Sequence, residues 1–230
     1  MRQVQHLMGT AISIDIPSAK DDKPLRAAFY RLAEIVEQFS PFKPDSELCR
    51  FQRGEIKQGK LSTEMKAVMT ACKKYEKLTD GYFSAYFEGK FNPTGYVKGW
   101  AIAQAGKCIE KSGYKTYCIC AGGDILARSD GSKTWNIGIQ DPRDKAKILD
   151  RSSILNGAVA TSGSYERGQH IINPKTGQPA DELLSLTVIG PEIIKADVLA
   201  TAAFAMGRAG VKFVERQKGY RALAVAREVI

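Results

Sequence analysis

The fold is decided by residues 183–207, which read LLSLTVIGPEIIKADVLATAAFAMG. The run LLSLTVIG predicts a strand, and KADVLATAAFAMG predicts a helix close behind it. Inside this helix Asp197 and Thr201 are four residues apart, so their side chains lie on the same face, one turn apart. The stretch therefore predicts a strand followed by a helix that presents two polar side chains together.

A carboxylate and a hydroxyl placed in this way offer two hard oxygens to a cation. Mg²⁺ usually takes one or two carboxylates, and waters and substrate phosphates complete its octahedron. Two structural roles explain the same residues. The Asp197 carboxylate interacts favourably with the helix dipole near a helix N-terminus, and the Thr201 hydroxyl donates a hydrogen bond to the carbonyl of residue 197. Spacing by itself favours these structural roles.

Working outward, strands are predicted mostly in the middle of the chain and helices mostly on either side of them. Other helices are predicted at 25–39, 62–78, 92–113 and 210–217, and other strands at 11–16, 115–129 around a glycine turn, 134–142, 156–168, 169–174 and 221–226, with an extended aromatic stretch at 81–91. We expect an α+β fold with central mixed or antiparallel sheets flanked by helices. The length predicts one domain over residues 1–230, or two closely merged lobes.

The chain carries 34 Lys and Arg against 25 Asp and Glu, a formal net charge of +9. Its basic residues are scattered, so we expect no nucleic-acid partner and favour a phosphorylated small molecule or no specific meaning for the charge. The five cysteines include no CxxC pair and indicate buried, reduced thiols of a cytosolic protein. The N-terminus has neither a long apolar segment nor a small-residue cleavage site, so we expect no membrane span and a cytoplasmic location.

Two glycine-containing turns are candidates for ligand contact. Lys98 falls in the first turn of a helix that follows a turn beginning at Asn92, and such a helix start attracts phosphate. Gly122 and Gly123 follow a predicted strand and let a ligand or another backbone come close. Asp124, next in the chain, binds a polar ligand group or serves as a turn residue. Neither stretch has P-loop or Rossmann spacing, and an ordinary turn explains the first equally well.

Two further segments carry polar chemistry. The hydroxyls around Gly163, including Ser162, and the loop amides beside them suit a phosphate or a sugar, although surface loops are commonly built this way. His170 precedes an apolar pair, where a histidine is usually packed and hydrogen-bonded. If it faces a phosphoryl site, it becomes a candidate general base, because its pKa lies near neutrality.

These motifs occur in the order expected of one family. The motifs are MGT at 8–10, PDSEL at 44–48, PTGYVKGWA at 93–101, AGGDI at 121–125, HIINPKTG at 170–177 and ADVLATAAFAMG at 196–207. The chain resembles the FAD:protein FMN transferases, the ApbE-type flavin transferases, from Met8 to about Gly207. The resemblance implies an enzyme that binds FAD with Mg²⁺ and transfers its FMN half to a threonine or serine hydroxyl of an acceptor protein, releasing AMP.

The resemblance also implies roles for individual residues. Asp197 and Thr201 look like side-chain metal ligands, the carbonyl of Gly95 looks like a backbone ligand, and His170 looks like the proton acceptor. Residues that resemble FAD contacts are Met8, Phe42, Tyr82, Phe83, Ser84, Asn92, Lys98, Gly122, Gly123, Asp124, Ser162 and Asn173.

Three positions depart from the family pattern. Members often carry Asp where this chain has Asn92, Asn173 and Ser84, and each change removes a negative charge near the predicted site. We therefore expect lower Mg²⁺ affinity, because Asp197 remains the main anionic ligand of the metal. Two alternatives to an intracellular flavin transferase stay open. One is a Mg²⁺-dependent FAD pyrophosphatase giving FMN and AMP, and the other is a non-catalytic flavin-binding protein.

Overall fold

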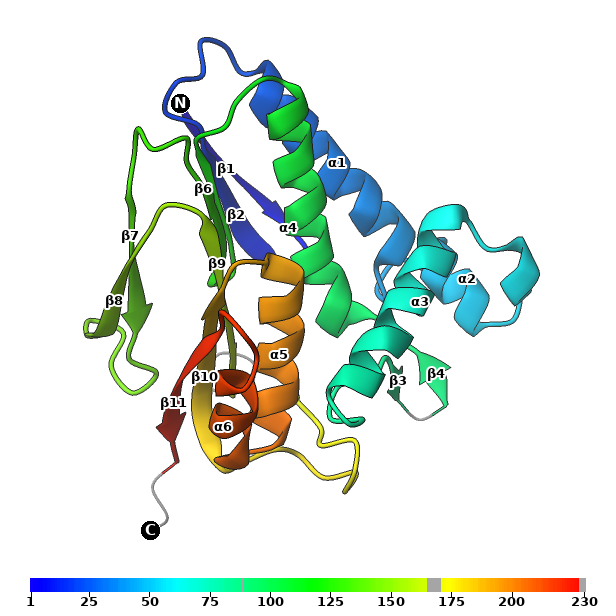
Figure 1. The fold of residues 1–230 in the computed structure, drawn as a ribbon. Helices are drawn as coiled ribbons and strands as arrows, with labels where there is room; N and C mark the ends of the chain where they lie inside the picture. The colour runs from blue at the N-terminus through cyan, green and yellow to red at the C-terminus, as the bar shows by residue number, and fades with distance from the viewer. Residues whose placement is uncertain (88, 165–170, 228–230) are drawn as a thin grey trace.

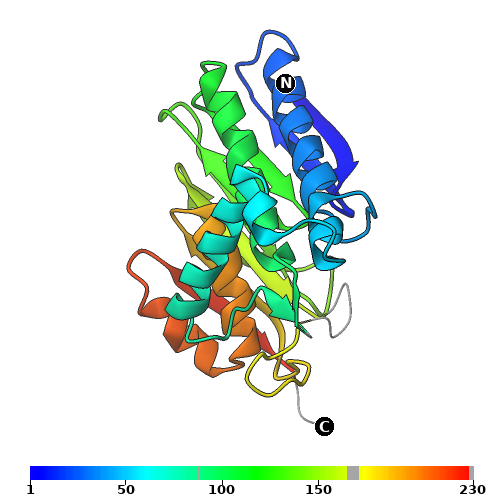
Figure 2. The ribbon, with the colours of Figure 1, turned by 90° about the vertical axis from the view of Figure 1, so that its right-hand side faces the viewer.

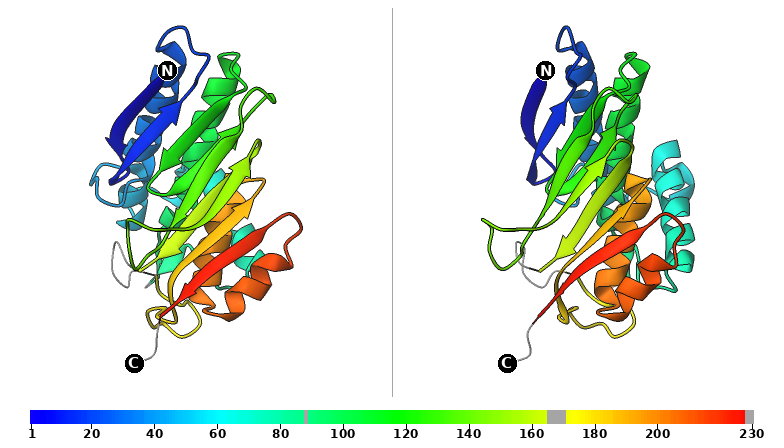
Figure 3. Two further views of the ribbon diagram at one scale, coloured as in Figure 1. Left: turned by 90° about the vertical axis from the view of Figure 1, so that its left-hand side faces the viewer. Right: turned by 60° about the vertical axis from the view of Figure 1, so that its left-hand side comes forward.

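The computed structural model describes residues 1–87, 89–164 and 171–227, and in this part of the chain a seven-stranded sheet forms the centre. Its strands run in the spatial order β1 (Arg2–Leu7), β2 (Thr10–Asp15), β5 (Tyr117–Ala121), β6 (Asp124–Arg128), β9 (Gly157–Gly163), β10 (Leu183–Gly190) and β11 (Arg221–Ala226). All neighbouring pairs are antiparallel. Figure 3 shows the sheet running from the β1 edge to the β11 edge. The α+β prediction is confirmed, with an antiparallel sheet.

Helices cover one face of this sheet. Three long helices, α1 (Lys23–Phe39), α4 (Thr94–Lys111) and α5 (Ile193–Ala205), lie side by side on it, and α6 (Ala209–Glu215) packs against α5 and β11 (Figures 1 and 2). Side chains with no exposed surface come from both layers: Ile14, Ile119 and Leu186 from the sheet and Leu32, Ile102 and Leu199 from the helices. The main core therefore lies between sheet and helices.

A hairpin of β7 (Trp135–Gln140) and β8 (Ile148–Ile154) lies on the opposite face of the sheet (Figure 1). The predicted strand at 134–142 is confirmed, and Trp135, Ile137 and Ile139 are buried while the residues between them are exposed. Trp135 and Ile137 join Val159 of β9 in a second, smaller apolar cluster.

The remaining elements belong neither to the seven-stranded sheet nor to the three long helices that cover it. They are α2 (Glu47–Gln52), the 3₁₀ turn η1 (Gln58–Lys60), α3 (Thr63–Leu78) and a small hairpin of β3 (Tyr86–Phe87) and β4 (Lys90–Phe91). Ser62 caps α3, since its hydroxyl accepts a hydrogen bond from the Met65 amide at 3.1 Å. Asp80 and Gly81 both have positive φ and end the helix. Within the described residues, no helix combines the length and the apolar composition that crossing a bilayer requires.

The structure adds two strands to the sequence predictions and corrects one. The N-terminal strand β1 and the strand β8 were not predicted, because both are largely exposed and lack a regular apolar face. The predicted strand at 169–174 is wrong for its described part. There, Ile172 forms a single bridge to Pro179, and the backbone of Asn173 closes a tight turn.

The contact between α5 and α6 leaves no room for a side chain at Gly210. A Cβ at this position would lie 2.0 Å from the carbonyl oxygen of Ala203 and 2.7 Å from its Cα. Because the obstacle is backbone, α6 has to move if the glycine is replaced.

We expect Gly210→Ala to lower the free energy of unfolding by about 1–3 kcal/mol, the usual cost of overpacking. Urea unfolding followed by circular dichroism measures this change. Gly59→Ala is the matched control, because a Cβ at Gly59 meets open space. Equal stability of the two variants would contradict the packing described here.

Candidate functional site

A cleft of about 1750 Å³ opens where the helical layer, the sheet and the hairpin of β7 and β8 meet. Its wall is built by the turn between β1 and β2, the loop after α1, the turn after α3, the start of α4, the turn between β5 and β6, the end of β9, part of the loop between Ile171 and Gly177, and one face of α5. Segments far apart in the chain therefore converge on one space.

Most of the sequence-predicted site residues line this cleft. They are Met8, Phe42, Tyr82, Phe83, Ser84, Asn92, Gly95, Lys98, Gly122, Gly123, Ser162, Asp197 and Thr201. Asp124 and Asn173 are not among the lining residues. His170, the predicted proton acceptor, lies outside the described residues.

Asp197 lies where α5 crosses α4, and its carboxylate is held by the backbone of α4. The Gly99 amide donates a hydrogen bond to Asp197 Oδ2 at 2.8 Å. A Cβ on Gly99 would lie 2.9 Å from the Asp197 Cβ and 3.2 Å from the Ile193 carbonyl oxygen. Sequence reasoning missed Gly99, although a glycine inside a helix is a signal of close packing.

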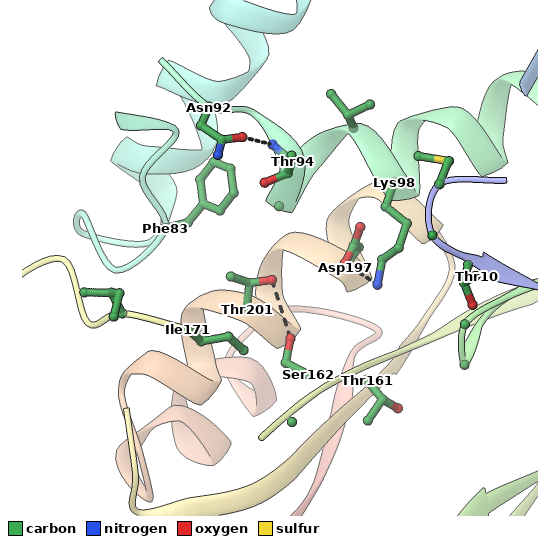
Figure 4. A pocket seen from close by; sticks show the side chains of 18 of the residues that line it. Thr10, Phe83, Asn92, Thr94, Lys98, Thr161, Ser162, Ile171, Asp197 and Thr201 are labelled. Carbon is green, nitrogen blue, oxygen red and sulfur yellow. Dashed lines mark hydrogen bonds and ion pairs between the residues drawn. The ribbon is translucent and has the colours of Figure 1, made fainter. Parts of the chain in front are cut away.

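Lys98 projects from α4 toward Asp197 (Figure 4). Its Nζ lies 2.6 Å from Asp124 Oδ2 and 3.8 Å from Asp197 Oδ1. Asp124 is fully buried, and its other oxygen accepts a hydrogen bond from the Thr161 amide at 3.1 Å. Asp124 therefore holds Lys98 in position from beneath the cleft wall. Two carboxylates against one ammonium leave a negative charge in excess, which suits a cation.

Burial raises the pKa of Asp197 and the nearby Asp124 carboxylate adds to the rise, while Lys98 and the Gly99 amide oppose it, and together these effects bring the pKa to about 7. The Asp197 side chain is only about 5% exposed. A divalent cation beside it would favour the ionised form.

Thr201 follows Asp197 by one turn on α5, as predicted, and faces the cleft (Figure 4). Its hydroxyl oxygen lies 3.5 Å from that of Ser162 on β9. A Cβ on Gly95 would lie 3.8 Å from Thr201 Cγ2 and 3.3 Å from the Phe83 ring, so the start of α4 is close to this hydroxyl.

The donors available here are oxygens of mixed kind. Asp197 supplies a carboxylate and Thr201 a hydroxyl, and the start of α4 lies beside them. Among the described residues, no group of three or more His, Cys, Asp or Glu side chains forms a metal site. This donor set fits a hard cation such as Mg²⁺ that takes its other ligands from water and from phosphate oxygens.

Two of the departures from the family pattern have structural roles here. The Asn92 side-chain oxygen accepts a hydrogen bond from the Thr94 amide at 3.3 Å, which shapes the turn into α4. Asn173 accepts from the Lys175 amide at 2.9 Å and donates to the carbonyl of Ala205, the last residue of α5, at 3.1 Å. An aspartate carboxylate cannot make the second bond, because it has no hydrogen to donate.

Aromatic and glycine residues shape the rim of the cleft. Phe42 is 90% exposed, and Met8 has a positive φ in the turn between β1 and β2. Lys175 lies with its Nζ 4.6 Å from the centre of the Tyr82 ring. Gly122 has a positive φ, and the Thr10 side chain fills the place of its missing Cβ.

Comparison with known proteins gives one family. The sequence model of the ApbE family matches residues 8–92 and 87–224. The chain is 30% identical over 143 residues to the FAD:protein FMN transferases of Klebsiella pneumoniae and Escherichia coli K12, covering 57% of this chain and 41% of each of those proteins. It is 26% identical over 266 residues to the protein of the same name from Vibrio cholerae, covering 87% of this chain and 79% of that one. The chain thus spans less than half the length of the first two relatives.

Solved structures have the same fold. The structure superposes on the ApbE protein of Thermotoga maritima with a TM-score of 0.86 at 23% identity, covering 98% of this chain and 94% of the other. For the flavin transferase ApbE of Vibrio cholerae the TM-score is 0.80 at 21% identity, with coverage of 98% and 96%. At such identities the likeness supports the fold alone.

We expect Asn173→Asp to lower the free energy of unfolding by about 1–2 kcal/mol, because the bond to Ala205 is lost and its carbonyl faces a carboxylate. Thermal and urea unfolding measure the change. Asn136→Asp is the control, because Asn136 accepts a hydrogen bond from Ser153 at an exposed site and an aspartate still accepts it. An unchanged stability of Asn173→Asp would contradict the assigned bond.

The raised pKa of Asp197 predicts a pH-dependent effect of Asp197→Asn, measured without divalent cations. Well below its unfolded pKa of 3.8 the wild-type carboxyl is neutral both folded and unfolded, so its burial costs nothing there. Between that range and pH 7 the unfolded chain ionises first, and above pH 7 the full cost of burying the charge remains. Asp197→Asn should therefore stabilise the protein at pH 8 by at least about 1 kcal/mol, since one pKa unit equals about 1.4 kcal/mol. The gain should be much smaller at pH 4, where the unfolded carboxyl is only about half ionised. A gain that is the same at both pH values, or matched by the exposed control Asp181→Asn, would oppose this.

Proposed function

Because the chain belongs to the ApbE family, we propose that it transfers the FMN half of FAD to a threonine or serine hydroxyl of an acceptor protein and releases AMP. The observation that carries the proposal is the arrangement of Lys98, Asp197 and Thr201 on the wall of one large cleft. These residues place an ammonium, a carboxylate and a hydroxyl where a diphosphate and its cation need them.

Mg²⁺ is the cation proposed for this site. Asp197 and Thr201 would hold it with the carbonyl of Gly95, and the excess negative charge around Asp197 and Asp124 favours its binding. When bound, the ion neutralises charge on the diphosphate and helps to align it. The small number of protein ligands predicts that Mg²⁺ binds more firmly with FAD than alone.

FAD binding is proposed to follow from the rest of the cleft. Lys98 stays oriented because Asp124 holds its ammonium, so it meets a phosphate oxygen without first being ordered. The start of α4 also lines this wall, and the positive end of its helix dipole favours a phosphate. The aromatic side chains of Phe42 and Tyr82 offer apolar surface to the two ring systems.

The proposed chemistry is a single displacement at the FMN phosphorus. The acceptor hydroxyl oxygen forms the new phosphoester bond, the bond to the AMP phosphate breaks, and the hydroxyl proton passes to a base. His170 is the proposed base. This role rests on the sequence alone, because His170 lies outside the described residues. If water takes the place of the acceptor hydroxyl, the same displacement is hydrolysis to FMN and AMP.

Incubation of the protein with FAD, Mg²⁺ and candidate acceptor proteins tests the proposal. Flavin fluorescence that stays on the acceptor band in a denaturing gel supports transfer. Free FMN and AMP without labelled acceptor support a pyrophosphatase, and intact bound FAD supports a binding protein. The cytoplasmic location and an intracellular acceptor stay predictions from the sequence.

Single substitutions separate the proposed roles. His170→Ala should lower transfer at least about 100-fold, the usual contribution of a general base, while FAD still binds. Asp197→Ala should lose transfer at every physiological Mg²⁺ concentration. His6→Ala is the control, because His6 is the other histidine of the chain and lies exposed on the edge strand β1. Near-normal transfer by His170→Ala would remove that residue from its role.

A further inference from the structure

We propose that Glu76 is a ligand-binding residue of the cleft and accepts a hydrogen bond from an N–H group at the edge of one of the two aromatic ring systems of the dinucleotide. The inference rests on the proposed function and extends it to a residue that the sequence did not single out. Glu76 lies in the last turn of α3 and lines the cleft.

The carboxylate of Glu76 keeps acceptor capacity, whereas two ammonium groups of the wall are already paired with carboxylates. Lys98 is paired with Asp124, and Lys175 is paired with Asp80. For Glu76 the described residues provide one side-chain partner, the Ser84 hydroxyl, at 3.3 Å from its Oε1. A carboxylate accepts several hydrogen bonds, so the group can bind a ligand donor as well.

The position of Glu76 is unfavourable for α3 itself. The C-terminal end of a helix carries partial negative charge, so a carboxylate in the last turn lowers helix stability. Within the described residues, no ion pair compensates it. Helix stability therefore does not explain this carboxylate, whereas a ligand with a donor does.

The surroundings of Glu76 indicate the chemistry of the donor. Ser84 is held in place because its hydroxyl oxygen accepts a hydrogen bond from the Tyr86 amide at 3.1 Å. Tyr82, Phe83 and Tyr86 are close to Ser84 in the sequence and line the same cleft. A carboxylate next to aromatic side chains suits a flat ring that is apolar on its faces and has an N–H at its edge. Both the imide of the flavin and the amino group of adenine have this chemistry.

Binding of four probes to Glu76→Gln and Glu76→Ala tests the inference, with Mg²⁺ present and affinity measured by calorimetry. The probes are FAD, FMN, ADP and inorganic pyrophosphate. We expect FAD to bind roughly tenfold more weakly to Glu76→Gln, the effect of losing a charge-assisted hydrogen bond, and more weakly still to Glu76→Ala. The loss should appear with FMN or with ADP but not with both, which identifies the ring.

Pyrophosphate distinguishes this role from a general charge effect. Removal of a negative charge favours an anionic ligand, so pyrophosphate should bind as before or more tightly. The melting temperature should stay the same or rise, because the unfavourable helix charge is gone. The double variant Glu76→Gln, Ser84→Asp returns a carboxylate to the same contact and should recover part of the FAD affinity.

The control is Glu215→Gln, an exposed carboxylate of α6 that does not line the cleft. FAD affinity within twofold of wild type in both Glu76 variants would overturn the inference and leave the proposed function standing. Equal losses for FMN, ADP and pyrophosphate would also overturn it. A wild-type protein that binds no FAD would overturn the proposed function and the inference together.

Discussion

The contact between α4 and α5 at Gly99 is the constraint on which the site depends. The amide of Gly99 bonds the Asp197 carboxylate at 2.8 Å, and the missing side chain lets the two helices approach. The neighbouring Lys98 is thereby brought beside the Asp197 carboxylate. Asp124, which lies on the sheet, pairs with the ammonium group of Lys98. Helix packing, the charge balance of the site and the proposed ligand binding thus all depend on the contact between α4 and α5. A larger residue at position 99 disturbs all three.

The three departures from the family pattern acquire physical meaning in this arrangement. Asn92 shapes the turn into α4, and Asn173 anchors its loop to the end of α5 through a donor that an aspartate lacks. Ser84 contacts the Glu76 carboxylate. An aspartate at position 84 would bring two like charges together there, so the serine is consistent with its neighbour. The lower Mg²⁺ affinity expected from these changes stays a prediction.

Much of the fold could be predicted from the sequence, because periodic apolar faces reflect burial directly. The helix from Leu25 to Phe39 and the strand alternation of Trp135, Ile137 and Ile139 are examples. The strand β1 escaped prediction because an exposed edge strand needs few apolar residues. The spacing predicted that Asp197 and Thr201 share one face of a helix, since that relation is local, whereas their proposed metal-binding role came from the family resemblance. The burial of Asp124 and the contact at Gly99 depend on elements distant in the chain, and no local pattern reports them.

Phe42 has a thermodynamic consequence for whatever enters the cleft. An aromatic ring that is 90% exposed at the rim is hydrated while the cleft is empty. A ligand that covers it removes apolar surface from water, and such removal lowers the heat capacity of the complex. The enthalpy of association then becomes more exothermic on warming, so the balance of heat and entropy in binding shifts with temperature even where the affinity changes little.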